Sequence, residues 1–214
     1  MSDRDERIER AGRLYERAVF GGDASALAEA DLGLDAVEAD LALARGRVVH
    51  ARFLEQRDED PGELALFERA AQLYRTLGDV RGESESLFWV GTFHQVVRGD
   101  DDAAVPALER SYALATQVGD KRTMSYALRH LGFAAHRAGR LDAARERLEA
   151  SAGLRREIGF LPGVAANLVG LAYIAAAQDR RDDARALVEE AAAIAEASGA
   201  HGIMRAVDEA RTQL

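Results

Sequence analysis

The residues best suited to bind a charged group lie between Lys121 and Ala138. This stretch combines basic and imidazole side chains and has no carboxylate; they are Lys121, Arg122, Arg129, His130, His136 and Arg137. The whole chain has a formal net charge of -9, so this stretch is a basic exception in an acidic protein. Because a guanidinium forms paired, charge-assisted hydrogen bonds to a carboxylate, the stretch favours binding of an acidic group.

Catalytic and metal-binding chemistry have weaker support. The chain has no Cys, which excludes thiol nucleophiles, thiolate zinc sites and disulfides. Its five His include no pair at the spacing of a helical metal motif, and His130 and His136 fall on different helix faces. An enzyme that uses His94, His130 or His136 is therefore a distant third hypothesis. We expect no catalytic residue, no metal and no cofactor.

Composition narrows the class of protein. A chain of 214 residues buries roughly 70% of its unfolded surface and needs no covalent staple. The N-terminal residues are densely charged and no uncharged run is apolar enough for lipid, so we expect no signal peptide, no membrane span and a cytoplasmic location. The negative charge opposes nucleic-acid binding. Lys121 is the only lysine among 28 basic residues, a usage typical of a GC-rich, bacterial genome.

A repeat of helices must position the basic stretch. Gly78, Gly119, Gly159 and Gly199 each close an amphipathic stretch, and they are 41, 40 and 40 residues apart. Between these stretches lies a second pattern, with apolar residues three and four apart, so each unit is predicted to be two helices, A and then B.

The turns of this repeat carry their own signals. Gly99 and Gly139 are predicted to end helix A in the left-handed conformation, with Asp179 in the corresponding place of the last unit. One extra residue between Gly99 and Asp102 would explain the period of 41. The predicted helix N-caps are Asp79, Asp102, Asp142 and Asp182. Residues 142–157 alternate acidic and basic side chains, which predicts a solvated face for helix B of the third unit.

The N-terminal fifth departs from the period. A helix is predicted from Arg4 to Phe20, followed by a break at Gly33 and by helix A of a first unit from Asp35 to Gln56, in an open register. The predicted organisation is one domain, 1–214, with N-terminal capping helices 1–34, a degenerate first unit 35–79, units 80–120, 121–160 and 161–200, and a capping helix 201–214.

The spacing of small and apolar residues resembles the tetratricopeptide repeat. The matching positions are Leu128, Leu131, Gly132, Gly139, Ala144 and Leu148 in the third unit, Leu87, Val90, Gly91, Ala104 and Leu108 in the second, and Leu168, Leu171, Ala172, Ala184 and Val188 in the fourth. The period exceeds the usual length of about 34 residues, which is similar to the extended variant of kinesin light chains, Rap-type receptors and actinobacterial regulator arrays. The resemblance implies an all-α fold, a right-handed superhelical stack of antiparallel helix hairpins forming an α-solenoid.

The resemblance also implies which side chains face the concave groove. They are Glu85, Phe88, Thr92 and Gln95 from the second unit, Tyr126, Arg129, Phe133, His136 and Arg137 from the third, and Val169 and Tyr173 from the fourth. In the alternative interpretation, Arg129 and Arg137 pair with acids of neighbouring helices, and the aromatic rings pack between units. Trp89 and Phe93 are predicted to pack one hairpin on the next, and His94 to be a core residue.

The first functional hypothesis is a non-catalytic adaptor or scaffold that holds a protein or peptide segment, partly acidic, in this groove. The alternative is a sensor or regulator that binds a small peptide or a metabolite. Because the sequence has no phosphate-binding loop or dinucleotide fingerprint, such a sensor would need a partner to act on. A homodimer through Ala-rich helices at an incompletely capped end also stays open.

Overall fold

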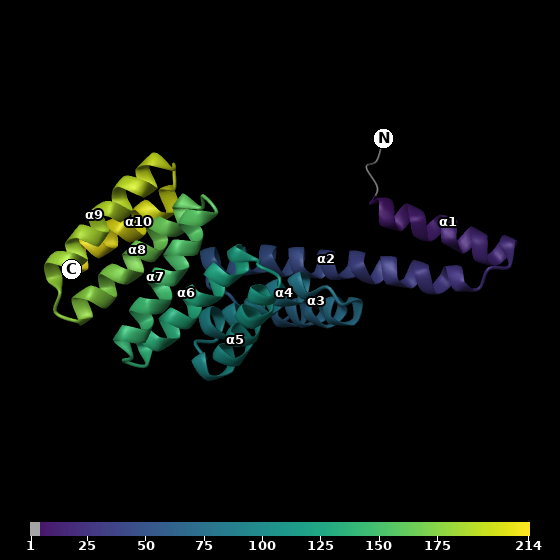
Figure 1. The fold of residues 1–214 in the computed structure, drawn as a ribbon, viewed down its shortest axis with the longest axis horizontal. Coiled ribbons are helices and arrows are strands. Elements are labelled where there is room, and N and C mark those ends of the chain that lie inside the picture. Colours follow the sequence, from purple (N-terminus) through teal and green to yellow (C-terminus); the bar gives the residue numbers. More distant parts are fainter. Residues whose placement is uncertain (1–4) are drawn as a thin grey trace.

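Helices follow one another along residues 5–214, the part of the chain that the computed structural model describes (Figure 1). They are α1 Glu6–Gly21, α2 Ser25–Gln56, α3 Glu63–Leu77, α4 Val80–Thr92, the π-helix η1 Phe93–Val97, α5 Asp101–Gln117, α6 Lys121–Arg137, α7 Leu141–Glu157, α8 Leu161–Ala177, α9 Arg181–Ala197 and α10 His201–Gln213. No strand occurs within the described residues, which confirms the all-α prediction. None of these helices has the length and apolar character of a membrane-spanning segment.

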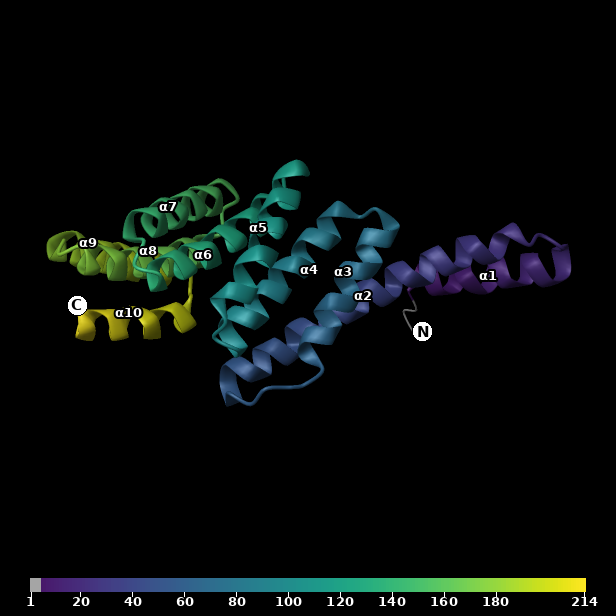
Figure 2. The same ribbon diagram turned by 90° about the horizontal axis from the view of Figure 1, so that it is seen from below.

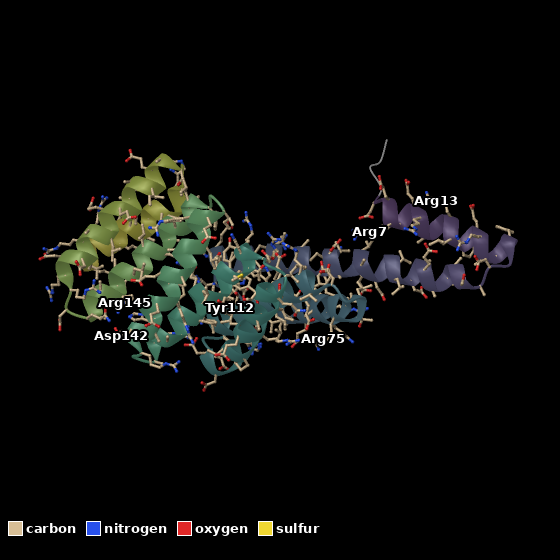
Figure 3. The ribbon with its side chains drawn as sticks, in the orientation of Figure 1. Arg7, Arg13, Arg75, Tyr112, Asp142 and Arg145 are labelled. Carbon is tan, nitrogen blue, oxygen red and sulfur yellow. The ribbon has the colours of Figure 1, made fainter. Side chains whose placement is uncertain are left out.

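Successive helices pack as hairpins that stack into a solenoid. The main partners are α2 with α3, α4 with α5, α6 with α7, and α8 with α9, while α10 packs on α8 and α9. Figure 2 shows α7 and α10 on opposite sides of α8. On α7, Asp142 and Arg145 form an ion pair of 3.4 Å and point into solvent (Figure 3). For these two residues, the prediction that α7 has a solvated face is confirmed.

Glycines allow the two helices of a hairpin to approach closely. A Cβ atom on Gly132 would lie 2.1 Å from Cδ1 of Leu148, and one on Gly91 would lie 2.6 Å from Cγ of Leu108. Gly46 of α2 stands in the same relation to Phe67 of α3, with 2.5 Å between the added Cβ and Cε1 of the ring. This contact fixes the register of the first unit, which the sequence leaves open.

The predicted break at Gly33 is wrong, because α2 is one continuous helix of 32 residues. A single interior glycine lowers helix stability by only about 1 kcal/mol, and packing against α1 on one side and α3 on the other offsets that. Arg4, the predicted start of the first helix, lies outside the described residues. The proposed boundary between residues 34 and 35 falls inside α2, and the division of the chain into units stays a proposal.

The extra residue of the second unit lies in a helix and not in the turn, so that prediction is also wrong. The turns after Gly99 and Gly139 have the same length, since α5 begins at Asp101 and α7 at Leu141. The insertion is absorbed by η1, a single π-helical turn at the end of α4, where the Arg98 amide donates to the Phe93 carbonyl over 3.3 Å. A π-turn holds one more residue than an α-turn without breaking the helix.

The turns confirm the predicted left-handed residues and correct most of the predicted caps. Gly99, Gly139 and Asp179 have φ of 66°, 71° and 59°. Asp79 is the N-cap of α4, with its carboxylate 2.9 Å from the Gly82 amide.

Asp102, Asp142 and Asp182 instead lie inside the first turns of α5, α7 and α9. Each helix begins two residues after the left-handed residue of the turn, which is earlier than predicted. The caps are therefore Asp100, Arg140 and Arg180. The three carboxylates still favour the helix starts, because they lie near the positive end of the helix dipole.

Candidate functional site

A pocket of about 490 Å³ opens between α2, α4 and the start of α6. Its walls include the predicted groove residues Glu85, Phe88 and Tyr126. They also include residues that the sequence did not assign to the groove, namely Arg47, Arg81, Trp89, Asp120, Lys121 and Arg122. The pocket therefore lies on the helix A side of consecutive units, next to the basic stretch that begins α6.

Basic side chains outnumber acids in the pocket. Arg47 lies 3.3 Å from Glu85, and Arg81 lies 3.5 Å from Asp120. Asp120 is also the N-cap of α6, because its carboxylate accepts from the amides of Arg122 and Thr123. The Arg122 guanidinium lies 5.4 Å from the centre of the Phe160 ring and has no ion-pair partner among residues 5–214. Lys121 pairs with Glu157 over 2.9 Å. The lining therefore has four cations and two acids, and Arg122 is its cation without an ion-pair partner in the described chain.

Aromatic rings form one wall of the pocket. The ring of Phe88 contacts those of Trp89 and Tyr126, with centroids 5.1 and 5.3 Å apart. Trp89 also stacks on Phe67 at 5.5 Å, which confirms that it packs one hairpin on the next. Its buried indole Nε1 has no hydrogen-bond partner within residues 5–214. The wall can therefore cover an apolar side chain while the arginines contact a charged one.

Two arginines, the buried Arg155 and the half-buried Arg129, lie behind Tyr126. The guanidinium of Arg155 is 4.9 Å from the Tyr126 ring centre, and this side chain is only 1% exposed. Arg155 and Arg129 both donate to Oδ1 of Asn167, over 3.0 and 2.8 Å. They also donate to the carbonyls of Gly163 and Ala166, each over 2.7 Å.

No carboxylate compensates this pair of cations within the described chain, because neither arginine forms an ion pair there. Burial, with a smaller contribution from the nearby Arg155, lowers the pKa of Arg129 to about 9. Burial also lowers the pKa of Arg155 to about 10. Both groups remain cations at neutral pH, at an energetic penalty that their carbonyl and amide partners offset only in part.

The predicted groove residue Gln95 forms a second polar cluster with His130, which the sequence did not assign to the groove. The Gln95 amide nitrogen donates to Asp101 over 2.9 Å and to the His130 carbonyl over 3.1 Å, which leaves its oxygen to accept from Nδ1 of His130 over 2.7 Å. This arrangement assigns the proton of the neutral ring to Nδ1. Burial, with a smaller contribution from Arg129, lowers the pKa of His130 to about 3. The ring is therefore neutral at physiological pH.

Of the remaining predicted groove residues, Arg137 and Tyr173 contact neighbouring helices. Arg137 donates from Nε to Asp101 over 2.6 Å, as the alternative interpretation holds for an acid on a neighbouring helix. The hydroxyl of Tyr173 donates to Gln213 of α10 over 3.0 Å. Phe133 lies 4.5 Å under the guanidinium of Arg129, Thr92 and Val169 are buried, and His136 and His94 are half-buried. A binding role for each of these residues stays a prediction.

Arg155 is the functional residue that the sequence pattern places wrongly. The alternation of charges along α7 predicts a solvated side chain, yet Arg155 is buried against α6 and α8. Its signal is weak, because only its spacing of four residues from the buried Ser151 places it on the inward face of α7. Arg47 could not be assigned because the register of α2 was open. Within residues 5–214, no cluster of His, Cys, Asp and Glu side chains has the arrangement of a metal site.

Comparisons with known proteins agree with this geometry. Residues 123–197 match the family described as tetratricopeptide repeat. The structure of BtubC (BKLC) from P. vanneervenii has a TM-score of 0.53 and 14% identity, over 91% of this chain and 90% of that chain. Residues 123–197 are thus a segment of tetratricopeptide-type repeats, and the chain as a whole folds as an α-solenoid of stacked helix hairpins.

A further similar structure comes from Podosopora anserina and is described as a candidate kinesin light chain with nearly identical TPR-like repeats. It has a TM-score of 0.43 and 20% identity, over 90% of this chain and 96% of that chain. No curated protein matches the sequence. Tetratricopeptide repeats are generally protein-interaction modules and typically non-catalytic scaffolds.

Proposed function

We propose that this protein is a non-catalytic adaptor or scaffold, cytoplasmic and bacterial, that binds an acidic protein or peptide segment in the pocket between α2, α4 and α6. The observation that supports the proposal is the excess of cations over acids in the pocket lining, beside the Arg129–Arg155 pair, which has no carboxylate partner among residues 5–214. Tyr126 joins the two features, because it lines the pocket and lies under Arg155.

A carboxylate bound at the pocket would lower the energy of the cations around it. Arg129 and Arg155 have lowered pKa values because burial removes water from their guanidinium groups. A negative charge nearby offsets this penalty, and a hydrogen bond to a charged group contributes about 1.5 to 3 kcal/mol. The aromatic wall would add contacts with an apolar side chain of the same segment. The expected ligand therefore alternates acidic and apolar residues.

The size of the pocket keeps the sensor hypothesis as the second candidate. Its volume of about 490 Å³ falls within the range of roughly 300 to 1,000 Å³ that is typical of small-molecule sites. A small anionic peptide or metabolite would use the same cations. The two candidates differ in the length of ligand that is needed for full affinity.

The single Trp of the chain provides a direct assay. Trp89 lines the pocket, so a ligand that enters should change its fluorescence. We would titrate the protein with a short peptide that alternates Asp or Glu with Leu, and with the matched peptide in which Lys replaces every acid. The acidic peptide should bind at least tenfold more tightly, and added salt should weaken it because the exposed cations are screened.

Two pocket variants and one control complete the test. Arg81→Ala and Arg122→Ala should each weaken the acidic peptide by about tenfold, or 1.4 kcal/mol. Arg185→Ala on α9 removes an arginine of similar exposure, 67% against 62% for Arg81, and should have no effect. Equal binding of both peptides, or unchanged affinity in both pocket variants, would contradict the proposal. Full affinity for a single amino acid or a dipeptide would favour the sensor.

A further inference from the structure

Exposed apolar side chains are concentrated on the first two helices. Of the eleven large apolar residues that are well exposed in the described chain, ten lie on α1 and α2, and only Leu161 lies elsewhere. Figure 1 shows α1 and the first half of α2 projecting as a hairpin from the stacked units. The solenoid itself thus buries its apolar residues, while the hairpin leaves many of its own in contact with water.

On α2, four of these residues form a regular stripe. Leu27, Leu34, Leu41 and Val48 are seven residues apart and are 47%, 42%, 49% and 53% exposed. A spacing of seven keeps one face of a helix apolar over its length and is the pattern by which one helix packs along another. No helix of the described chain covers this stripe.

Exposed residues of α1 extend the same face. Ile8, Tyr15 and Val19 are 40%, 57% and 53% exposed. Tyr15 and Val19 directly follow Leu14 and Ala18, which pack on α2.

Leu27 of α2 likewise directly follows Ala26, which packs on α1. Each residue is rotated about 100° around the helix axis from the one before it. In two antiparallel helices, the residues that directly follow the contact residues therefore lie on the same side of the pair. Arg17 and Glu29, which directly precede contact residues, pair across the opposite side.

The apolar face is complementary to itself. A two-fold axis that crosses α2 between positions 37 and 38 places Leu27 opposite Val48 of an antiparallel second copy, and Leu34 opposite Leu41. The same axis brings Asp31 within one position of Arg45 of the other copy. Both charged residues are exposed and form no ion pair within residues 5–214. The apolar stripe and this charged pair therefore match in one register, in which Glu38, paired with Arg69 of its own chain, lies beside the axis.

The face is also large enough for a specific interface. Residues 27–48 of α2 extend about 33 Å and α1 about 24 Å at 1.5 Å per residue. With each helix about 10 Å wide, the area is about 600 Å² per copy, and stable interfaces bury roughly 600 to 1,000 Å² per partner. A twofold contact is the commonest way in which a soluble protein covers such a surface.

We propose that the α1–α2 hairpin is a dimerisation element that binds a second copy of this chain in antiparallel orientation to form a four-helix bundle. The stripe from Leu27 to Val48 forms its centre, and Ile8, Tyr15 and Val19 cover the flanks. The second half of α2 has no α1 beside it and receives the α1 of the other copy. This contact involves the N-terminal hairpin and not the Ala-rich C-terminal helices.

The test is the mass of the protein in solution by light scattering over a dilution series. The full chain should have twice its 23.2 kDa at micromolar concentration. Leu34→Asp combined with Leu41→Asp should weaken the dimer by about 100-fold or more, because four charges enter the centre of the interface. Leu32→Asp is the matched control, since Leu32 is on the same helix, is 54% exposed and directly precedes Gly33, on the opposite side of the hairpin. Circular dichroism should show equal helicity in all variants, because the replaced side chains are exposed.

A disulfide experiment tests the register. The chain has no Cys, so Leu34→Cys with Leu41→Cys introduces the only thiols. Seven residues of helix separate these positions by about 10 Å, which is too far for a bond within one chain. Mild oxidation should therefore link two chains, whereas Leu32→Cys alone should leave them unlinked. A monomer at all concentrations, or a dimer that the paired Asp variant leaves intact, would overturn the proposal.

Discussion

Replacing Gly132 by Ala tests whether close helix packing, and not helix propensity, explains the glycines of the repeat. In an open helix position, Gly→Ala stabilises by about 0.5 to 1 kcal/mol. At Gly132 the new methyl would lie 2.1 Å from Cδ1 of Leu148 and 3.3 Å from the Ala144 carbonyl oxygen. Leu148 is fully buried and cannot move aside. Overpacking of this kind costs about 1 to 3 kcal/mol, so we expect a net loss of about 0 to 2.5 kcal/mol.

Gly153 provides the matched control for this substitution. It lies inside α7, and nothing lies within 4 Å of the Cβ that Ala would add. Gly153→Ala should therefore raise the free energy of unfolding by about 0.5 to 1 kcal/mol. Urea titration followed by circular dichroism would measure both variants. In a Leu148→Ala background the clash disappears, and Gly132→Ala should become neutral or stabilising. Equal stabilisation by both alanines in the parent chain would refute the packing argument.

Two further predictions concern His130 and Asp179. The folded pKa of His130, about 3, is below the ordinary value of 6.5, so the unfolded chain binds the proton more strongly and stability falls as the pH drops from 6.5 towards 3. His130→Gln keeps a donor for Gln95 but does not titrate. At pH 5 the variant should therefore retain up to about 2 kcal/mol of the free energy of unfolding that the parent chain loses. Equal acid sensitivity of the two chains in urea titrations would contradict this. Asp179 has a left-handed φ of 59°, so Asp179→Gly should stabilise by about 0.5 to 1 kcal/mol. Gly139→Asp, at the equivalent turn, should lower the urea midpoint of unfolding. A lower midpoint for Asp179→Gly than for Gly139→Asp would exclude the explanation by backbone conformation.

The fold was accessible from the sequence because its signals are local. Each closing glycine, such as Gly119, marks a turn by its own backbone conformation, and Gly132 marks a close approach within one hairpin. Features that depend on contacts between neighbouring units could not be predicted from the sequence. The π-turn of η1 has the same residue types as a regular helix, so the sequence showed the extra residue but not its location.

The candidate site was only partly accessible for the same reason. Tyr126 and Phe88 follow from their position in the repeat, and both line the pocket. Arg47 enters the pocket because α2, from the preceding hairpin, contributes to its wall beside α4 and α6, which no local pattern encodes. Arg155 is buried because α8 supplies carbonyl and amide acceptors across the unit boundary. Charge alternation along α7 contains no information about those acceptors.

In the proposed dimer, the continuity of α2 would fix the spacing of the two proposed binding sites. Arg47, at the pocket, lies on the same uninterrupted helix as the two-fold axis near position 37. At 1.5 Å per residue, the two Arg47 positions are about 30 Å apart along the helix. A flexible partner with two acidic segments could occupy both pockets if at least about nine extended residues join them. Such a partner would bind with the avidity of a bivalent ligand, and one with a shorter connection would not.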